Sequence, residues 1–208
     1  VLISAGPTIE QLDPVRYISN HSSGKMGYSL AETALSLGAE VKLISGPTNQ
    51  SISSENIKIV HIKTGNELLE AIRNDYNNSD IVIMAAAVSD YKPIEFSEKK
   101  IKKDNNELNI KFEKTTDILF ELGQNKKNQI LVGFALENNN ELSHAKNKLE
   151  KKNLDLIVLN SLNDEGAGFG YDTNKITVID YAGKVTPYKL KKKDEVADDV
   201  FKHIIELM

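Results

Sequence analysis

The chain has 208 residues, enough to bury one large core, of which 40% are hydrophobic and 27% are charged. Its formal net charge is −4, whereas a general nucleic-acid binder would usually be basic. The lack of cysteine excludes disulfides and thiolate metal sites, and no apolar run reaches the roughly 18 residues that a membrane span needs. We therefore expect a cytoplasmic protein that binds neither nucleic acid nor a membrane.

Short apolar runs alternate with segments of helical spacing, which predicts a Rossmann-like, three-layer α/β domain with a mainly parallel sheet over residues 1–208. The predicted strands span residues 1–4, 40–45, 57–62, 80–88, 130–136 and 154–160. The predicted helices span residues 24–37, 66–76 and 141–153, and Asn66 is the candidate N-cap of the second. A C-terminal β-hairpin of residues 175–180 and 184–190, turning around Gly183, and a helix over 194–207 close the chain. Because Val1 already stands in a strand, we expect a further segment upstream.

A lysine-rich stretch over about residues 91–113 interrupts this alternation. Its sequence EKKIKKDNNELNIKF alternates polar and apolar residues and lacks helical spacing. We therefore expect a β-flap that lies outside the main sheet.

The segment DPVRYISNHSSGKMG, Asp13 to Gly27, follows the first strand, and ligands of open parallel sheets bind beyond the carboxyl ends of the strands. It is not a Walker loop, because Met26 follows Gly24-Lys25, and the dinucleotide glycine fingerprint is also absent. Ser22-Ser23-Gly24 at the start of a helix forms a candidate anion site, although Ser23 could serve only as an N-cap. An N-cap needs neither Asn20 nor His21, so their presence favours a binding site.

The segment AAAVSDY, residues 85–91, ends another predicted strand. Its three alanines allow a flat group to approach the backbone, and Asp90 supplies acceptor oxygens; tight helix packing with an exposed turn aspartate is the alternative. Lys100 stands in the flap, and Lys148 and Lys152 share a helical face, although lysine runs are also typical of solvated surfaces. The four histidines are scattered, which argues against a zinc site held by the protein and leaves the magnesium ligands unassigned.

Taken in order, the segments DPVRYISNHSSGKMG, LISGPT, AAAVSDYKP, KIKK, VGFALE, KNLDLIVLN and GAGFGYDTNKITVID resemble bacterial phosphopantothenoylcysteine synthetase, also called phosphopantothenate–cysteine ligase. The resemblance covers essentially the whole chain, and the first segment is highly specific. In that family the ligase follows a flavin-dependent decarboxylase domain within a bifunctional protein of coenzyme A biosynthesis. The resemblance therefore implies that such a domain precedes Val1 in the full-length protein.

The resemblance implies a two-step ligation. The carboxylate of 4'-phosphopantothenate attacks CTP, with Mg²⁺, to give an acyl-cytidylate and pyrophosphate, and the amine of L-cysteine then displaces CMP to give 4'-phosphopantothenoyl-L-cysteine. Animal enzymes of this kind use ATP, whereas the segment AAAVSDYKP and the flap favour CTP here. The resemblance also implies a homodimer whose active site is completed across the interface.

By motif match, Asn20 corresponds to the residue that stabilises the acyl-cytidylate, Arg16 to one that contacts this intermediate, and Lys100 to a flap lysine of the second step. Because Lys99 precedes Lys100, the flap lysine could instead be Lys99. Asp90 matches an aspartate that contacts the cytidine. The other expected nucleotide contacts are Ser22, Ser23, Gly24, Met84, Ala85, Ala86, Ala87, Lys100, Thr116, Asp117, Ile118, Leu119, Phe134, Lys148 and Lys152.

Two positions depart from the family pattern. Pro7 replaces a common glycine, which removes one N–H donor from the first loop, and Thr116 stands where proline is frequent. Two other classes remain as alternatives. A non-catalytic nucleotide-binding module would bind CTP without releasing pyrophosphate, and a dehydrogenase of the NAD type would require the missing glycine fingerprint.

Overall fold

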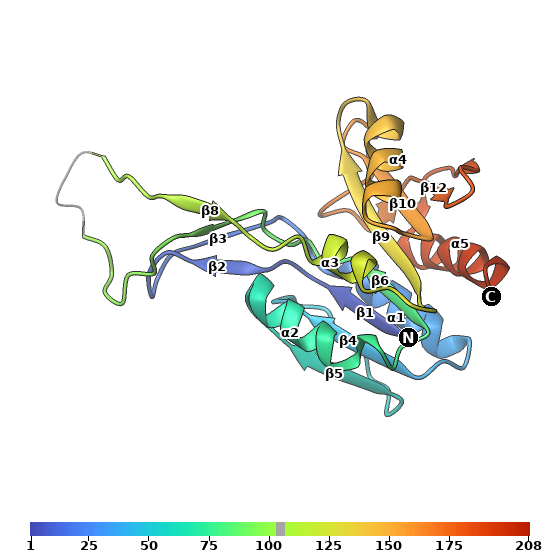
Figure 1. Ribbon diagram of the computed structural model, residues 1–208, viewed down its shortest axis with the longest axis horizontal. Helices are drawn as coiled ribbons and strands as arrows, with labels where there is room; N and C mark the ends of the chain where they lie inside the picture. Colours follow the sequence, from blue (N-terminus) through green and yellow to red (C-terminus); the bar gives the residue numbers. More distant parts are fainter. Residues whose placement is uncertain (103–106) are drawn as a thin grey trace.

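An eight-stranded sheet forms the centre of the computed structural model, which describes residues 1–102 and 107–208 (Figure 1). In spatial order its strands are β13 (Val185–Pro187), β12 (Ile176–Asp180), β10 (Leu156–Ser161), β9 (Ile130–Glu137), β6 (Ile81–Met84), β1 (Leu2–Ala5), β4 (Val41–Ser45) and β5 (Ile57–His61). The six strands from β10 to β5 are parallel, whereas β12 and β13 are antiparallel to their neighbours. The predicted mainly parallel sheet and C-terminal hairpin are confirmed.

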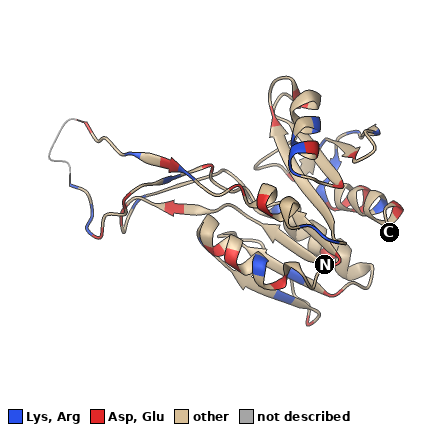
Figure 2. Ribbon diagram, viewed as in Figure 1, with Lys and Arg blue, Asp and Glu red and all other residues tan. Residues whose placement is uncertain are grey.

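Helices cover both faces of this sheet: α1 (Lys25–Ser36), α2 (Gly65–Tyr76), α3 (Ile118–Gln124), α4 (Glu141–Lys151) and α5 (Lys193–Glu206). Successive side chains of a strand point to opposite faces. Ile3 accordingly packs in the core with α1 and α5, whereas Leu2 packs in a second core with α2, α3 and α4. The three-layer architecture is confirmed. The strands β1 and β6 between these cores carry no charged residue, and the charged residues lie mainly on the helices, loops and projecting segments (Figure 2).

The predicted cap of α2 was wrong by two residues. Thr64 is the N-cap, and its hydroxyl accepts a 3.1 Å hydrogen bond from the backbone N–H of Glu67, whose carboxylate in turn accepts from the N–H of Thr64. This is the capping box that Thr64 and Glu67 encode by their spacing, and Asn66 lies inside the helix.

Several short elements were not predicted. The expected polar loop after β1 contains a hairpin of β2 (Ile9–Gln11) and β3 (Tyr17–Ser19), and the expected turn at Thr116–Leu119 continues into α3. Both are too short to show a clear hydrophobic period in the sequence. A small ribbon of β11 (Thr173–Asn174) and β14 (Lys191–Lys192) lies near the start of α5.

The flap is confirmed as a β-ribbon outside the main sheet. Its strands β7 (Tyr91–Pro93) and β8 (Phe112–Lys114) pair antiparallel, and together with the β2–β3 hairpin they project from the body as an arm (Figure 1). The last lysine of the KIKK segment, Lys103, lies outside the described residues. Within the described part of the chain, no helix is long and apolar enough to cross a membrane.

Candidate active site

Two adjoining pockets lie at the carboxyl end of β6 and beside the carboxyl-terminal half of β9. The α1 pocket takes its name from the start of α1 and is lined by Ser22–Gly27, Ala85–Ala87, Phe134–Leu136, Asn160, Gly168, Phe169, Asn174 and Lys193. The α3 pocket is lined by Met84, Ala86, Val88, Asp90, Tyr91, Lys114–Leu119, Phe134 and Lys152. Ala86 and Phe134 line both pockets, so two ligands bound there would meet at these residues.

The turn that opens α1 is built around glycine. Gly24 is the N-cap with φ of 78°, a backbone conformation that favours glycine, and a Cβ on it would meet the Thr48 hydroxyl at 3.0 Å. Thr48 donates a 2.6 Å hydrogen bond to the carbonyl of Ser23, which fixes the turn. Ser23 is therefore not the N-cap that the sequence allowed, and it lines the α1 pocket beside Ser22.

The side chain of Asn20 is fixed at the junction of the first loop and β6. Its Nδ2 donates a 2.9 Å hydrogen bond to the carbonyl of Ala87, which also accepts from the backbone N–H of Thr8 at 3.1 Å. A side-chain amide has two N–H donors, so the second remains for a ligand. The missing N–H of Pro7 removes no hydrogen bond here. The bridge between the first loop and Ala87 uses the carbonyl of Gly6 and the N–H of Thr8.

Most of the predicted nucleotide contacts meet in the α3 pocket. The structure brings together Met84, Ala86, Asp90, Thr116, Asp117, Ile118, Leu119, Phe134 and Lys152, and it places Ser22, Ser23, Gly24, Ala85 and Ala87 in the α1 pocket. Asp117 caps α3 by accepting from the N–H of Phe120 at 3.1 Å, and it also pairs with Lys152 at 2.8 Å. Asp117 and Lys152 therefore neutralise each other, whereas Asp90 and Lys114 also line this pocket.

Lys148 does not share this location. Its ammonium pairs with Glu137 at 2.5 Å, and it lines neither pocket. Lys152 follows the end of α4 as its C-cap and turns to Asp117 instead. The helical spacing of the two lysines therefore does not bring them to one pocket.

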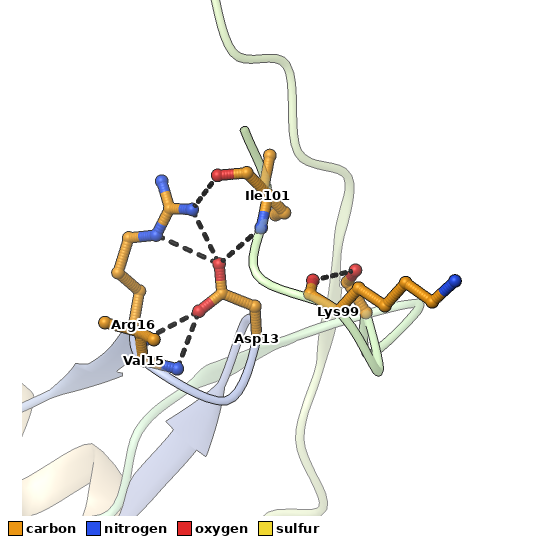
Figure 3. Close-up of polar contacts among 6 residues, drawn as sticks. Asp13, Val15, Arg16, Lys99 and Ile101 are labelled. Atoms are coloured by element: carbon orange, nitrogen blue, oxygen red, sulfur yellow. Dashed lines mark hydrogen bonds and ion pairs between the residues drawn. The ribbon is translucent and has the colours of Figure 1, made fainter. Parts of the chain in front are cut away.

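Arg16 and Lys100 lie on the arm and also line neither pocket. The guanidinium of Arg16 pairs with Asp13 at 2.7 Å and donates to the carbonyl of Ile101 at 2.5 Å, which joins the β2–β3 hairpin to the flap (Figure 3). Lys100 is exposed, and the neighbouring Lys99 accepts a 2.6 Å bond on its carbonyl from Ser97. Asn20 likewise lines neither pocket, and it reaches the α1 pocket only through its bond to Ala87.

Asp13 organises this junction. Its carboxylate accepts from the backbone N–H groups of Val15 and Arg16 at 2.8 Å each and from that of Ile101 at 3.1 Å. Burial alone would raise the pKa of Asp13, but these N–H donors and the Arg16 guanidinium outweigh it and lower the pKa to about 2. The Asp13 carboxylate is therefore ionised near neutral pH, and both of its oxygens accept hydrogen bonds.

Several lining residues of the α1 pocket were not singled out as contacts from the sequence, among them Asn160, Gly168, Phe169, Asn174 and Lys193. Asn160 could have been found, because it is the last residue of a predicted strand. Lys193 is the last of three consecutive lysines, a pattern that is typical of a solvated surface. In the structure, however, it is only 4% exposed. The GAGFG segment has no strand-to-helix context, so only the fold shows that it reaches the pocket.

A model of the DNA/pantothenate metabolism flavoprotein C-terminal domain matches residues 1–208. The chain belongs to this family. It is 43% identical over 207 residues to the coenzyme A biosynthesis bifunctional protein CoaBC of Bacillus subtilis, covering all of this chain and 51% of that protein. It is also 50% identical over 209 residues to a cysteine/cysteine sulfinic acid decarboxylase from an unknown prokaryote, covering 58% of that protein.

Solved structures of the family support the same assignment. The crystal structure of the C-terminal domain of a CoaBC protein aligns with a TM-score of 0.84 and 40% identity over 99% of this chain and 93% of that one. The family expected from the motifs is therefore confirmed. The chain spans about half the length of the curated relatives described above.

Proposed function

We propose that this domain ligates 4'-phosphopantothenate to L-cysteine with CTP, through an acyl-cytidylate. The observation that carries the proposal is the meeting of the α1 and α3 pockets at Ala86 and Phe134. An acid bound in one pocket and a nucleotide in the other would present a carboxylate to the α-phosphate at this boundary. Membership in a family that includes CoaBC proteins supports coenzyme A biosynthesis as the setting.

The proposed first step forms one bond and breaks one. A carboxylate oxygen of the acid attacks the α-phosphorus of CTP, and the bond to the bridging oxygen of pyrophosphate breaks. Asn20 lines neither pocket, but it donates one N–H to the carbonyl of Ala87, which lines the α1 pocket, and its second N–H would serve the developing negative charge on oxygen. The start of α1 adds the positive end of a helix dipole.

The second step joins the amine of cysteine to the activated acyl carbon. The amine attacks this carbon, the bond to the cytidylate oxygen breaks, CMP leaves, and the nitrogen loses a proton. A flap cation, Lys100 in our proposal, would stabilise the departing phosphate. The cytidine would lie in the α3 pocket, where Asp90 offers acceptors to a ribose hydroxyl or the cytosine amine.

Magnesium would enter with the nucleotide. Among residues 1–102 and 107–208, no group of three or more histidine and carboxylate side chains is arranged to hold a metal ion. Mg²⁺ commonly keeps several waters and binds substrate phosphates with few protein ligands. The residues present therefore fit a nucleotide-bound ion better than a dedicated protein site.

We further propose that the domain works as a homodimer whose arm completes the site of the second copy. Arg16 and Lys100 line neither pocket of their own chain. The arm also carries apolar side chains that are half or more exposed: Val15, Tyr17, Tyr91, Ile94, Phe96 and Leu108. Such a concentration of exposed apolar groups is typical of an interaction surface.

Pyrophosphate release tests the proposed function. The protein is incubated with CTP, Mg²⁺ and 4'-phosphopantothenate, with and without cysteine, and ATP serves as the nucleotide control. We expect release that requires the acid, with CMP formation increased by cysteine. Binding of CTP without release would favour a non-catalytic nucleotide-binding module and would contradict the ligase.

A further inference from the structure

The segment that follows β6, which we call the β6 loop (residues 85–90), forms walls of both pockets. Ala87 lines the α1 pocket. Val88 and Asp90 line the α3 pocket, and Ala86 lines both. The backbone of this loop therefore sets where one pocket lies relative to the other. In the proposed first step, a ligand of one pocket must react with a ligand of the other across this loop.

The part of the β6 loop that lines the α1 pocket is joined to the end of β1 and to the residues after it. The N–H of Ala86 donates to the Ser4 hydroxyl at 3.1 Å. The N–H of Ala87 donates to the carbonyl of Gly6 at 2.9 Å, and the carbonyl of Ala87 accepts from the N–H of Thr8 at 3.1 Å. These bonds continue the parallel pairing of β1 with β6 past the ends of both strands.

The part of the β6 loop that lines the α3 pocket is joined to the segment before α3. The hydroxyl of Thr115 donates to the carbonyl of Ser89 at 2.7 Å, and the N–H of Thr115 donates to the carbonyl of Asp90 at 2.9 Å. Thr115 itself lines the α3 pocket. The two parts of the β6 loop are therefore held by different neighbours.

The hydroxyl of Thr8 joins these two parts. Its Oγ1 accepts a 3.0 Å hydrogen bond from the N–H of Ser89, and the carbonyl of Thr8 is itself fixed by the Ser19 hydroxyl at 2.8 Å. Among the described residues, no other hydrogen bond links residues 88–90 to residues 6–8. Thr8 is fully buried and lines neither pocket, so it can act only through the β6 loop and not by touching a ligand.

We propose that Thr8 is a positioning residue of the ligation, whose hydroxyl holds the walls of the α1 and α3 pockets in a fixed relation. The inference rests on the proposed function, in which ligands of the two pockets react with each other. Loss of the hydroxyl would keep the bonds of Ala87 and of Thr115, so each pocket would retain its own wall. The buried N–H of Ser89 would lose its acceptor, which is unfavourable, and the loop would shift between Ala87 and Ser89. Reacting groups that are misplaced in this way lose rate even when both ligands remain bound.

Pyrophosphate release from CTP with Mg²⁺ and 4'-phosphopantothenate tests this role. Thr8→Val keeps the branched shape and removes the hydroxyl, and we expect it to lower kcat by about tenfold or more while the Kd of each ligand alone, measured by calorimetry, changes less than about threefold. Thr8→Ser keeps the hydroxyl and should restore kcat. Thr33→Val is the matched control, because it removes a buried, hydrogen-bonded hydroxyl on α1 that lines neither pocket. An unchanged kcat in folded Thr8→Val, an equal fall in Thr33→Val, or a tenfold weaker Kd for either ligand alone would overturn the proposal.

A second variant provides the test if Thr8→Val does not fold. Thr8→Cys replaces the hydroxyl with a thiol, whose sulfur is only a weak hydrogen-bond acceptor. We expect its kcat to lie about threefold or more below that of Thr8→Ser, because the N–H of Ser89 is then poorly satisfied. Equal kcat values for folded Thr8→Cys and Thr8→Ser would contradict the proposal.

Hydrogen exchange separates this inference from the proposed function, because it needs no turnover. In Thr8→Val the amide of Ser89 should exchange about tenfold or more faster than in the wild type, whereas the amide of Ala87, which is bonded to Gly6, should change little. Unchanged exchange at Ser89 would overturn the inference. If the wild-type chain releases no pyrophosphate, the ligase is contradicted, and the exchange still decides whether Thr8 joins the two walls. Pyrophosphate release with the same kcat in Thr8→Val contradicts the positioning role and retains the ligase.

Discussion

The side-chain amide of Asn20 donates a 2.9 Å hydrogen bond to the carbonyl oxygen of Ala87, which joins the loop before α1 to the end of β6. Ala87 lines the α1 pocket and Asn20 does not, so this bond ties the amide to the wall of that pocket. The same bond limits the rotation of the side chain, and preorganised donors of this kind are effective in stabilising a developing charge.

Asn20→Asp is expected to lower pyrophosphate release by about 10²–10³-fold, since it replaces a donor with a negative charge beside a developing negative charge. Rapid-quench measurement of acyl-cytidylate formation tests this first step directly. Asn74→Asp makes the same charge change at an exposed position of α2 and should react like the wild type. Near-normal formation of the intermediate by Asn20→Asp would show that this amide does not act in the first step.

Lys100→Gln is expected to keep pyrophosphate release in the first turnover and to slow amide formation by about tenfold or more, because the flap cation is assigned to the second step. The two products are followed separately in a single-turnover reaction with cysteine. Lys99→Gln is the matched control. If Lys99→Gln slows amide formation and Lys100→Gln does not, the flap residue is Lys99.

Asp13→Ala is expected to release the flap from the β2–β3 hairpin, because it removes the acceptor for the N–H of Ile101 and the partner of Arg16. We expect hydrogen exchange at the Ile101 amide to accelerate by about tenfold or more at neutral pH. Arg16→Lys keeps the charge but loses the planar fork, so its effect should be smaller. Unchanged exchange in Asp13→Ala would contradict this junction.

The pH dependence of the junction follows from the same carboxylate. Its pKa is lowered from 3.8 to about 2 in the folded chain. Ionised Asp13 therefore contributes its full stabilisation at every pH above the ordinary pKa of 3.8. The stabilisation is lost as the pH falls through about 2. We therefore expect Ile101 protection to be constant from neutral pH to about pH 4 and to fall towards pH 2, whereas Asp13→Ala should lack this transition.

Gly46→Ala is expected to destabilise the fold by about 1–3 kcal/mol or more, as overpacking does in other cores. A Cβ on Gly46 would lie 1.9 Å from the carbonyl oxygen of Pro7, so the first loop would have to move. Gly65→Ala is the control, because its Cβ would meet only ordinary contacts at 3.4 Å and beyond. Equal midpoints for both variants in denaturant unfolding would contradict the close approach of the two loops.

Sedimentation equilibrium tests the proposed homodimer. We expect a mass of about twice 23.1 kDa at micromolar concentration. Phe96→Glu, which places a charge on the exposed apolar surface of the arm, should shift the mass towards the monomer. A monomeric wild-type chain would contradict the dimer for this fragment, and a dimeric Phe96→Glu variant would locate the interface elsewhere.

The sequence by itself determined the sheet and most of its helices, because burial on a strand or a helix leaves a local period in the hydrophobic residues. It also located the loops after β1 and β6, since ligand-bearing residues follow strand ends in parallel sheets. The segment Asp13–Gly27, taken with six later segments in order, indicated the family. Short elements such as α3 were not predicted, because seven residues that include a glycine are too few to show a periodic pattern of hydrophobic residues.

Only the tertiary structure decided which of these residues share a pocket. Arg16 and Asn20 are four positions apart, yet the β2–β3 hairpin carries one to the arm while the other contacts Ala87. Lys193 appears in the sequence as one of three adjacent lysines, and only the packing of α5 and the Gly168 loop buries it. The physical reason is that burial and proximity depend on contacts between distant segments, which chain topology sets and local periodicity does not record.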